Sequence, residues 1–389
     1  MKERTMLVAG VMSGTSADGV DVALVRIAPG RRTPQITLEA HEHFAYPAAL
    51  RRAVLAAMNA RAIASAELAR LQWRLGIAYA EAVAATAKKH AAKVDLIGCH
   101  GQTLYHQPAR TAYAGRSFAC TWQAGEMATL AASIHAPVVS NFRPADMAAG
   151  GEGAPLVPLL DYVLFAHATR GRVLQNVGGI ANLTAIPAGA VQDAVMAFDT
   201  GPGNMVMDWL AEKLLGRPFD RNGAVAARGA VLEPVLSRML KQPYFRKSPP
   251  KTAGREQFGR EYSAEFLAAC RKASRKPEDA LATAAALTAA TIAGAYARFV
   301  RRAMGRHAVD FIVSGGGARN ATLMRMLANL LEPMGCTLAA SEEFGMPAEA
   351  KEAAAFALLA WQTWHHRPGN LPAATGAARP AILGQVTYV

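Results

Sequence analysis

The chain is 389 residues long, with 52% hydrophobic and 18% charged residues and a formal net charge of +13 at pH 7. Because single hydrophobic cores stop growing near roughly 250–300 residues, this length predicts two domains. The composition excludes a long disordered tail. Lys and Arg are scattered and no basic run alternates with aromatic residues, so we expect no nucleic-acid binding. The charge indicates either a basic surface or attraction for anionic ligands.

The sequence contains no segment typical of export or membrane insertion. Its start, MKERTMLVAGVM, has a minimal apolar run that breaks into SGTSADGVD, unlike a signal peptide. The uncharged stretch 280–297 consists mostly of Ala and Thr and predicts a buried helix, not a membrane span. The four cysteines are widely spaced and form no CxxC pair, which favours reduced thiols over a zinc site or disulfides. We expect a cytoplasmic protein without membrane contacts.

The first part of the chain alternates apolar runs and polar turns. Apolar residues 6–12 and 20–27 flank the turn SGTSADG and predict a hairpin that begins a sheet. Apolar residues at three- and four-residue spacing predict an amphipathic helix from Ser65; they are Leu68, Leu71, Leu75, Ala78 and Ala82. Strands are expected at 94–99, ending in a loop HGQTLYHQP, and at 137–140, ending in a loop NFRPADMAAGGEGAP. Such strand-end loops bind ligands in α/β sheets.

The pattern restarts after the glycines near Gly150. VLQNVGGIANLTAI predicts a strand, a glycine turn and a second strand, so we expect the second domain to begin here. A largely helical region follows, and DFIVSGGGARNATLM predicts a strand that runs through glycines into a helix. Gln175 lies in an otherwise apolar strand, where a buried amide needs a hydrogen-bond partner, and the sequence suggests no role for it.

Three glycine-rich turns suggest phosphate binding. The first, SGTSADG, offers three hydroxyl groups and a flexible backbone for close approach of a polyphosphate, and Asp18 is a candidate to hold Mg²⁺ through water. An ordinary hairpin turn is the alternative. No GxxxxGK[ST] string is present, which disfavours a P-loop kinase.

The other two turns repeat this layout. NVGGIAN carries Gly178 and Gly179, and SGGGARN places Gly315 and Gly316 between a strand and a helix, where the backbone can approach a nucleotide. GxGxxG spacing is missing, so a dinucleotide fold is weakly supported. Three strand-linked glycine turns over two domains suggest a nucleotide held in a cleft between them.

A series of motifs in order then identifies a family. MSGTSADGVDVAL, HGQT, GGEGAPLVP, NVGGIANLT, FDTGPGN, PKTAGRE and LPAATGAARPAILG together resemble the anhydro-N-acetylmuramic acid kinases. The resemblance implies an α/β fold of the acetate and sugar kinase, Hsp70 and actin superfamily. This fold consists of two actin-like (ribonuclease H-like) domains with an interdomain nucleotide cleft. The resemblance also implies ATP and Mg²⁺ as cofactors and a homodimer. The implied reaction is one in which water opens a 1,6-anhydro sugar while O6 is phosphorylated.

From the resemblance we expect residues 1–145 with 355–389 to form the domain with the first phosphate loop. Residues 146–354 would form the domain with the second phosphate loop, the catalytic aspartate and an adenosine-side glycine loop.

The resemblance also assigns residues to roles. The catalytic base, which deprotonates water beside the anomeric carbon, falls on Asp199. The first ATP-binding turn comprises Ser13, Gly14, Thr15, Ser16, Ala17, Asp18, Gly19 and Val20, and the later turns add Gly178, Gly179, Gly315 and Gly316. The sugar pocket falls on His100, Gln102, Arg143 and Glu352, with Arg143 suited to a carboxylate. Each of these has a structural alternative: His100 within a buried loop, Arg143 paired with Asp146, and Glu352 as a solvated helix charge.

Two positions depart from the family pattern, and two other functions stay open. Asn141 stands where many relatives carry Asp, and Leu160-Asp161 replaces a common aromatic-His pair; both concern the sugar pocket. One alternative function is a kinase of another hexose or amino sugar, with Asp199 deprotonating a sugar hydroxyl. The other is an ATP-dependent switch of the Hsp70 or actin type, which would need a peptide-binding module or assembly surfaces that the sequence does not indicate.

Overall fold

The computed structural model describes residues 4–31, 33–340 and 346–389. The chain divides into two compact units, Met1–Leu164 with Glu349–Val389, and Phe165–Ala348. These boundaries differ from the expected ones after 145 and before 355. The reason is that the buried Asp146 carboxylate accepts hydrogen bonds from Asn370 Nδ2 and Thr375 Oγ1, both 2.7 Å away, which tie the segment after 145 to the C-terminal segment.

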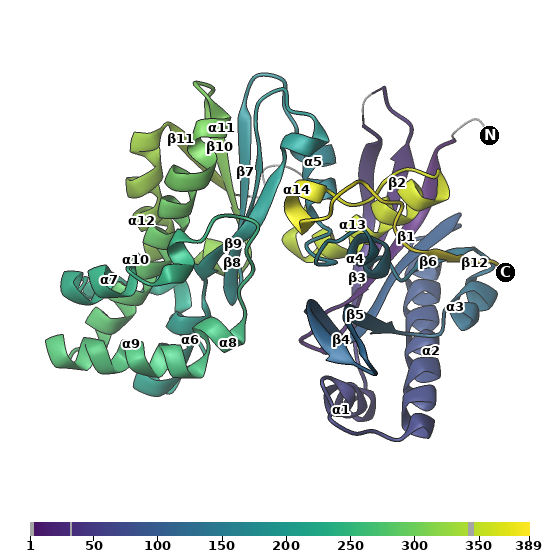
Figure 1. Cartoon of the computed structure of the whole chain (residues 1–389), viewed down its shortest axis with the longest axis horizontal. Coiled ribbons are helices and arrows are strands. Elements are labelled where there is room, and N and C mark those ends of the chain that lie inside the picture. Colours follow the sequence, from purple (N-terminus) through teal and green to yellow (C-terminus); the bar gives the residue numbers. More distant parts are fainter. Residues whose placement is uncertain (1–3, 32, 341–345) are drawn as a thin grey trace. The chain divides into compact units, whose positions relative to one another are not determined.

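The first unit is built on a seven-stranded sheet with the order β12-β6-β4-β1-β2-β3, with β5 paired to β4. Its strands are β1 (Met6–Ser13), β2 (Gly19–Ala28), β3 (Gln35–Ala45), β4 (Leu96–Tyr113), β5 (Arg116–Ala124), β6 (Val138–Ser140) and β12 (Gln385–Thr387). Its helices are α1 (Ala48–Ala57), α2 (Ser65–Lys89), α3 (Met127–Ile134), α4 (Arg143–Ala148), α5 (Pro158–Phe165), α13 (Ala348–Trp364) and α14 (Pro372–Thr375). Figure 1 shows the long α2 running beside this sheet. The predicted first hairpin and the helix from Ser65 are confirmed.

The second unit is built on a five-stranded sheet with the order β11-β10-β7-β8-β9. The strands are β7 (Gly171–Val177), β8 (Ile180–Ile186), β9 (Met196–Pro202), β10 (Val309–Ser314) and β11 (Cys336–Ala340). The helices are α6 (Met205–Leu215), α7 (Glu233–Met239), α8 (Arg255–Phe258), α9 (Arg260–Ala273), α10 (Pro277–Ala295), α11 (Arg301–Met304) and α12 (Ala321–Leu331). Short helical turns are η1 (Gln192–Ala194), η2 (Arg221–Gly223), η3 (Ala226–Arg228), η4 (Pro243–Arg246), η5 (Tyr296–Val300), η6 (Gly316–Arg319) and η7 (Glu332–Met334).

The two sheets share one topology. In the first, β1, β2 and β3 form an antiparallel meander, and β4 and β6 extend it in parallel beside β1. In the second, β7, β8 and β9 form the meander, and β10 and β11 extend it beside β7. This repeated arrangement is ribonuclease H-like and confirms the expected α/β class. It also places the turns SGTSADG and NVGG at equivalent positions, between the first two strands of each unit.

Close helix–sheet packing in the first unit depends on two glycines. A Cβ atom at Gly10 of β1 would collide with the backbone of Ala353, and one at Gly98 of β4 would collide with the backbone of Phe356. Both contacts lie on α13, whose side chains from Ala353 to Trp361 are all buried. The helix therefore rests directly on the central strands of the sheet.

The apolar stretch expected at 280–297 forms a core helix. It lies within a continuous helical segment, Pro277–Met304, that is long and apolar enough to cross a membrane, but 78% of its most apolar window is buried inside the structure. Residues such as Leu287, Ile292 and Tyr296 pack in the core of the second unit. The prediction of a buried helix is confirmed.

Two expected strand-end loops contain regular structure. Within NFRPADMAAGGEGAP, residues Arg143–Ala148 form the short helix α4. HGQTLYHQP does not form a loop after a short strand, because β4 continues through it to Tyr113. The extension pairs with β5 in a long antiparallel hairpin, with register shifts near Leu104 and between Gln107 and Thr111. Pairing with a strand that comes later in the chain thus determines the structure of this polar segment.

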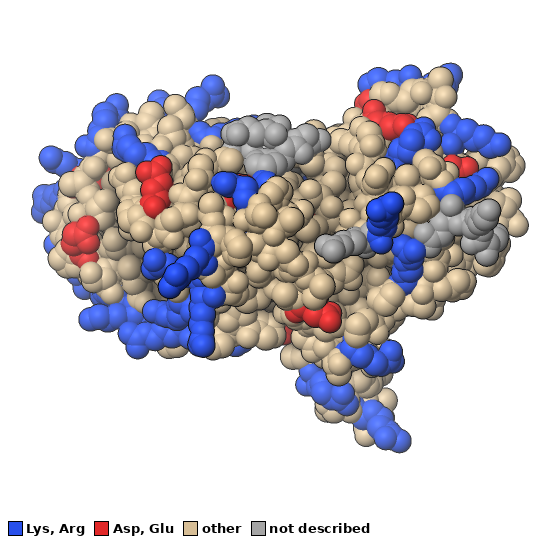
Figure 2. Space-filling model, turned by 90° about the horizontal axis from the view of Figure 1, so that it is seen from above, with Lys and Arg blue, Asp and Glu red and all other residues tan. Residues whose placement is uncertain are grey.

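Basic side chains are spread over the face of the molecule that Figure 2 shows. On the face shown in Figure 2, Lys and Arg side chains lie in separate groups between larger areas of uncharged residues. The four cysteines, Cys99, Cys120, Cys270 and Cys336, form no disulfide.

Candidate active site

The first glycine turn joins β1 to β2 and exposes its polar groups. Thr15, Ser16 and Asp18 are exposed, while Ser13 is buried beneath them. The turn is closed by a hydrogen bond from the Ala17 amide to the Gly14 carbonyl (3.1 Å), and Ser16 Oγ donates to Asp18 Oδ1 (2.8 Å). Hydroxyl and carboxylate groups are thus presented to solvent at one end of the sheet.

Gln102 binds the buried side of this turn through its side chain. Its side chain is fully buried, its Oε1 accepts a hydrogen bond from Ser13 Oγ (2.6 Å), and its Nε2 donates to the Gly14 carbonyl (3.1 Å). Tyr46 Oη lies 2.8 Å from Ser13 Oγ on the same buried side. The HGQT segment and the SGTSADG turn therefore form one hydrogen-bonded unit.

His100 and Arg143 contact each other directly. His100 Nδ1 lies 2.7 Å from the Gly101 carbonyl oxygen, to which it must donate, and its Nε2 accepts from Arg143 Nε at 3.0 Å. This pattern requires a neutral imidazole with its proton on Nδ1. Burial, and next the positive charge of Arg143, lower the pKa of His100. The ring also packs against Phe356 of α13, with centroids 4.6 Å apart.

Arg143 is the first residue of α4, and its guanidinium group donates hydrogen bonds to two groups of the protein, one of which is His100. Nη1 donates to the Gly153 carbonyl (2.7 Å), and burial lowers the pKa of Arg143 to about 10, opposed by the nearby charges of Glu352 and Asp146. Glu352 is exposed on α13, yet the protein atoms packed around its carboxyl group raise its pKa, and Arg143 opposes this shift. The two charges therefore stabilise each other.

Asp146 binds other groups than Arg143. Besides Asn370 and Thr375, its carboxylate accepts a hydrogen bond from the Gly153 amide (2.8 Å). The structure thus brings together the expected sugar-pocket residues His100, Arg143 and Glu352. Gln102, two residues after His100 in the sequence, instead contacts the candidate ATP-binding turn.

The two positions that depart from the family pattern have partners within the first unit. Asp161 is buried and forms an ion pair with Lys351 Nζ at 2.7 Å, next to Glu352 on α13. Asn141 adopts a left-handed backbone conformation (φ 58°), which asparagine tolerates better than most residues, and its Nδ2 donates to Gln385 Oε1 (3.3 Å). Lys351 therefore compensates the buried charge that Asp161 introduces.

In the second unit, two glycine segments lie against each other. The Gly178 carbonyl accepts a hydrogen bond from the Asn204 amide (2.7 Å), and the Gly179 carbonyl accepts from the Gly203 amide (2.9 Å). A Cβ atom at Gly203 would collide with the Gly178 carbonyl. The turn NVGG and the segment GPGN therefore depend on glycine to approach this closely.

The third glycine segment joins the same group. Gly315 has a left-handed conformation (φ 80°), and a Cβ atom there would lie only 2.5 Å from Asn176 Oδ1. At Gly316 a Cβ atom would lie 3.2 Å from Asn204 Nδ2. The candidate ATP-binding glycines of this unit thus converge at the ends of β7 and β10.

A row of polar residues crosses the sheet beside these glycines. Ser314 pairs in register with Asn176, Asn176 with Asn182, and Asn182 with Asp199, across β10, β7, β8 and β9. Residues paired in register project from the same face of a sheet. The row therefore connects the glycine segments with the expected catalytic carboxylate.

Asp199 is fixed by η4 and the segment that follows it. Its Oδ2 accepts a hydrogen bond from the Ala253 amide (2.7 Å), its amide donates to the Lys251 carbonyl (3.0 Å), and its carbonyl accepts from Tyr244 Oη (2.9 Å). The nearest acid downstream, Asp208 on α6, has a pKa raised to about 6 by burial. These contacts hold the Asp199 carboxylate and backbone in a defined position.

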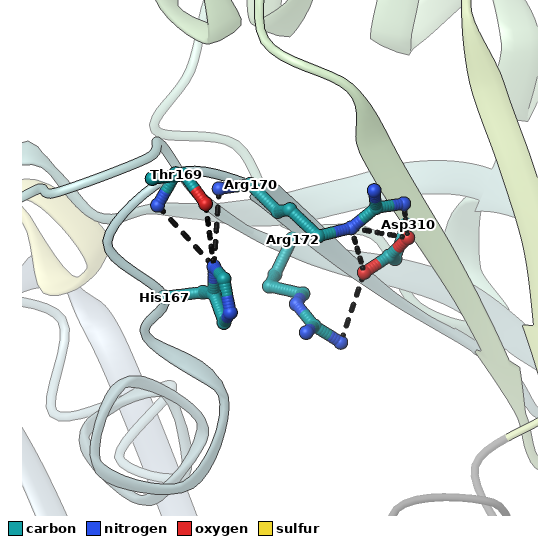
Figure 3. Close-up of polar contacts among 5 residues, drawn as sticks. All are labelled: His167, Thr169, Arg170, Arg172 and Asp310. Atoms are coloured by element: carbon teal, nitrogen blue, oxygen red, sulfur yellow. Dashed lines mark hydrogen bonds and ion pairs between the residues drawn. The ribbon is translucent and has the colours of Figure 1, made fainter.

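A charged cluster of the second unit lies at the other end of the strands. Asp310, near the start of β10, accepts hydrogen bonds from Arg170 and forms an ion pair with Arg172 Nη1 at 3.0 Å (Figure 3). The hydrogen bond from Arg170 lowers the pKa of Asp310, although burial opposes the shift. His167 Nδ1 accepts from the amides of Thr169 and Arg170. This cluster joins β7 to β10 far from the glycine segments and is structural.

Sequence reasoning missed several residues of this region. Asn182 and Asn204 lie within the quoted motifs NVGGIANLT and FDTGPGN, and Lys251 lies within PKTAGRE. Their residue types gave no specific signal, because the contacts that involve them depend on strand register and on loops distant in sequence. Gln175, left without a role, donates from Nε2 to the Asn182 carbonyl (2.8 Å) and so links β7 to β8.

The comparisons with known proteins agree with this organisation. The family model described as anhydro-N-acetylmuramic acid kinase matches residues 6–389. An anhydro-N-acetylmuramic acid kinase of Salinibacter ruber is 44% identical and covers 98% of the chain and 96% of its own length. One of Bacillus cereus is 41% identical, with coverage of 98% and 99%. The chain is therefore a kinase that belongs to the anhydro-N-acetylmuramic acid kinase family.

Proposed function

We propose that this kinase uses ATP to convert 1,6-anhydro-N-acetylmuramic acid to N-acetylmuramic acid 6-phosphate during recycling of the cell wall. In this reaction a water oxygen bonds to the anomeric carbon, the bond from that carbon to O6 breaks, and O6 takes the γ-phosphoryl group while ADP leaves. The observation that carries the proposal is the Asp199 carboxylate, held in place by Ala253 beside the glycine segments of the second unit.

Asp199 acts in this mechanism as the general base. A carboxylate accepts the proton of the attacking water, and a fixed orientation is needed for efficient transfer. The Ala253 amide and the backbone contacts to Lys251 and Tyr244 supply that orientation. The base therefore works from a site where rotation of its side chain is restricted.

The sugar contacts are proposed at His100, Arg143 and Glu352. The Arg143 guanidinium suits the lactyl carboxylate of the substrate, since charge-assisted hydrogen bonds between these groups are strong. The neutral His100 holds Arg143 through Nε2, and Glu352 lies near enough to balance its charge. For Gln102 we propose an indirect role, because its buried amide group binds the ATP turn.

ATP is proposed to bind through the turn Ser13–Val20 and the glycines at 178, 179, 315 and 316. Among the described residues no group of three or more His, Cys, Asp and Glu side chains can hold a metal ion. A Mg²⁺ ion bound by phosphate oxygens and water, with Asp18 as an indirect ligand, fits the exposed carboxylate of that turn. Such an ion supplies positive charge that neutralises the phosphoryl oxygens.

The first test compares substrates. Purified protein with ATP and Mg²⁺ is given a panel of anhydro and ordinary amino sugars, and products are weighed by mass spectrometry. We expect a mass gain of phosphate plus water on the anhydro sugar alone. A gain of phosphate without water on an ordinary sugar would favour the alternative kinase, and ATP turnover without any sugar product would favour a switch.

A second prediction concerns the ATP turn. Gly14→Val should raise the KM for ATP and lower turnover, because a branched side chain blocks close approach of phosphate to the backbone. The fold should survive, since the nearest atom to a Cβ at Gly14 is Ser16 Oγ at 3.6 Å. Gly294→Val on the exposed side of α10 is the matched control, because a Cβ there has no neighbour within 4 Å. Unchanged ATP kinetics in a folded Gly14→Val protein would make SGTSADG an ordinary hairpin turn.

We also propose that the protein is a cytoplasmic homodimer that binds neither membranes nor nucleic acid. The buried position of the one helix with the length and composition of a membrane span, among the residues that the structure describes, supports the membrane part of this proposal. The dispersed basic residues on the face in Figure 2 support the nucleic-acid part.

A further inference from the structure

Lys251 is a buried cation in the second unit. Only 2% of the residue is exposed, and it forms no ion pair with any Asp or Glu in the part of the chain that the structure describes. Its Nζ donates a hydrogen bond to the Tyr244 carbonyl at 3.2 Å. Burying an ammonium group without a direct ion pair is costly, so its presence calls for a specific function.

Three aromatic rings surround this ammonium group. Nζ lies 4.7 Å from the ring centre of Tyr244, 5.0 Å from that of Phe299 and 5.7 Å from that of Phe198. The rings come from η4, η5 and β9, so the lysine joins three elements at one point. Aromatic faces attract cations, and the attraction is strongest away from water.

The same segment holds Asp199. The Lys251 carbonyl accepts from the Asp199 amide, the Ala253 amide donates to Asp199 Oδ2, and Tyr244 Oη donates to the Asp199 carbonyl. The hydrogen bond from Lys251 Nζ to the Tyr244 carbonyl connects the two ends of this segment. The lysine side chain therefore stabilises the segment that makes these contacts with Asp199.

Charged groups on the surrounding elements set the ionisation of Lys251. The pKa of Lys251 is lowered to about 8, chiefly by burial and also by the positive charges of Arg298 of η5 and Lys247 of the same segment, while Asp199 of β9 opposes the shift. The Tyr244 phenol does not compete as an anion at neutral pH, because burial raises its pKa.

We propose that Lys251 is a positioning residue for Asp199. The ammonium group, held in the aromatic box of Phe198, Tyr244 and Phe299, fixes the segment that orients the Asp199 carboxylate. The inference rests on the proposed function insofar as Asp199 is the base. It applies equally if Asp199 deprotonates a sugar hydroxyl in place of water.

The test uses the full chain and whichever sugar gives product in the substrate panel. The role of Lys251 can then be tested even if the substrate is not the anhydro sugar. Lys251→Met keeps the length of the apolar stem and removes the charge, Lys251→Arg keeps the charge, and Lys247→Met removes an exposed charge from the same segment as a control. Turnover and both KM values are measured from pH 6 to 9.5, with thermal unfolding as the check on folding.

We expect kcat of Lys251→Met to fall by roughly 10–100-fold, because small misplacements of a catalytic group have effects of this size. Both KM values should stay within about twofold, since the Lys251 side chain is buried and does not reach the surface where ligands bind. Lys251→Arg should restore most of the lost turnover, and Lys247→Met should resemble the wild type. In the wild type kcat should decline above a pH of about 8 as Lys251 loses its proton, and this decline should be absent in Lys251→Met.

A folded Lys251→Met protein with normal turnover would overturn the inference. If that variant does not fold, the pH dependence of the wild type and the turnover of Lys251→Arg still test the inference. A wild-type kcat that stays constant from pH 7 to 9.5, or a folded Lys251→Arg protein as slow as an Asp199 variant, would also overturn it.

Discussion

Asp199→Asn is expected to lose roughly 10²–10⁴-fold or more in kcat while both ligands still bind. Asparagine keeps the size of the side chain, and its amide oxygen can still accept the hydrogen bond from the Ala253 amide. It cannot take a proton from water at neutral pH. Steady-state kinetics and calorimetric titration with a nonhydrolysable ATP analogue and the sugar measure the two effects separately.

The matched control is Asp208→Asn. Asp208 is the next acidic residue after Asp199 in the sequence, but it lies on α6, outside the row of paired residues from Ser314 to Asp199. The turnover of this variant should stay within a few-fold of the wild type. Heavy-oxygen water gives a second measurement, since the label should enter the anomeric hydroxyl of the product at early times, after correction for spontaneous exchange. Near-normal turnover in a folded Asp199→Asn protein, or no early label in the wild type, would remove Asp199 as the water-activating base.

Asp146→Ala is expected to destabilise the first unit by about 3–5 kcal/mol. The substitution leaves three donors, the Gly153 amide, Asn370 Nδ2 and Thr375 Oγ1, without their buried acceptor. Urea unfolding followed by tryptophan fluorescence reports mainly on this unit, because Trp209 is the one tryptophan of five that lies in the second unit.

The control for this experiment is Asp193→Ala, which removes an exposed carboxylate in η1. It should change the free energy of unfolding by less than about 0.5 kcal/mol, the usual range for surface substitutions. A loss below about 1 kcal/mol in Asp146→Ala would mean that water replaces the carboxylate and that Asp146 does not hold the C-terminal segment in place.

The sequence predicted the elements whose signals are local. Glycine turns between apolar runs indicated the β1–β2 and β7–β8 hairpins, and helical spacing from Ser65 indicated α2. The motif FDTGPGN indicated Asp199 only through family resemblance, because one aspartate before a glycine turn has no specific chemical meaning.

Features that depend on distant contacts could not be predicted. The extension of β4 to Tyr113 requires β5 as a partner, and the bond between Arg143 and His100 requires α4 to pack beside that strand. Lys251 appeared to be an ordinary charged residue, since nothing in its neighbourhood in the sequence places three aromatic rings around it.

The placement of α13 has a consequence for synthesis of the chain. The second unit is one continuous segment, Phe165–Ala348, whereas the first unit is completed only by Glu349–Val389. Since α13 rests on Gly10 and Gly98, the first sheet leaves the ribosome with one face uncovered and receives its helix only after the second unit has been made. The N-terminal unit is therefore the last to reach its final structure, and a chain that stops at residue 348 would carry a complete second unit beside an unfinished first.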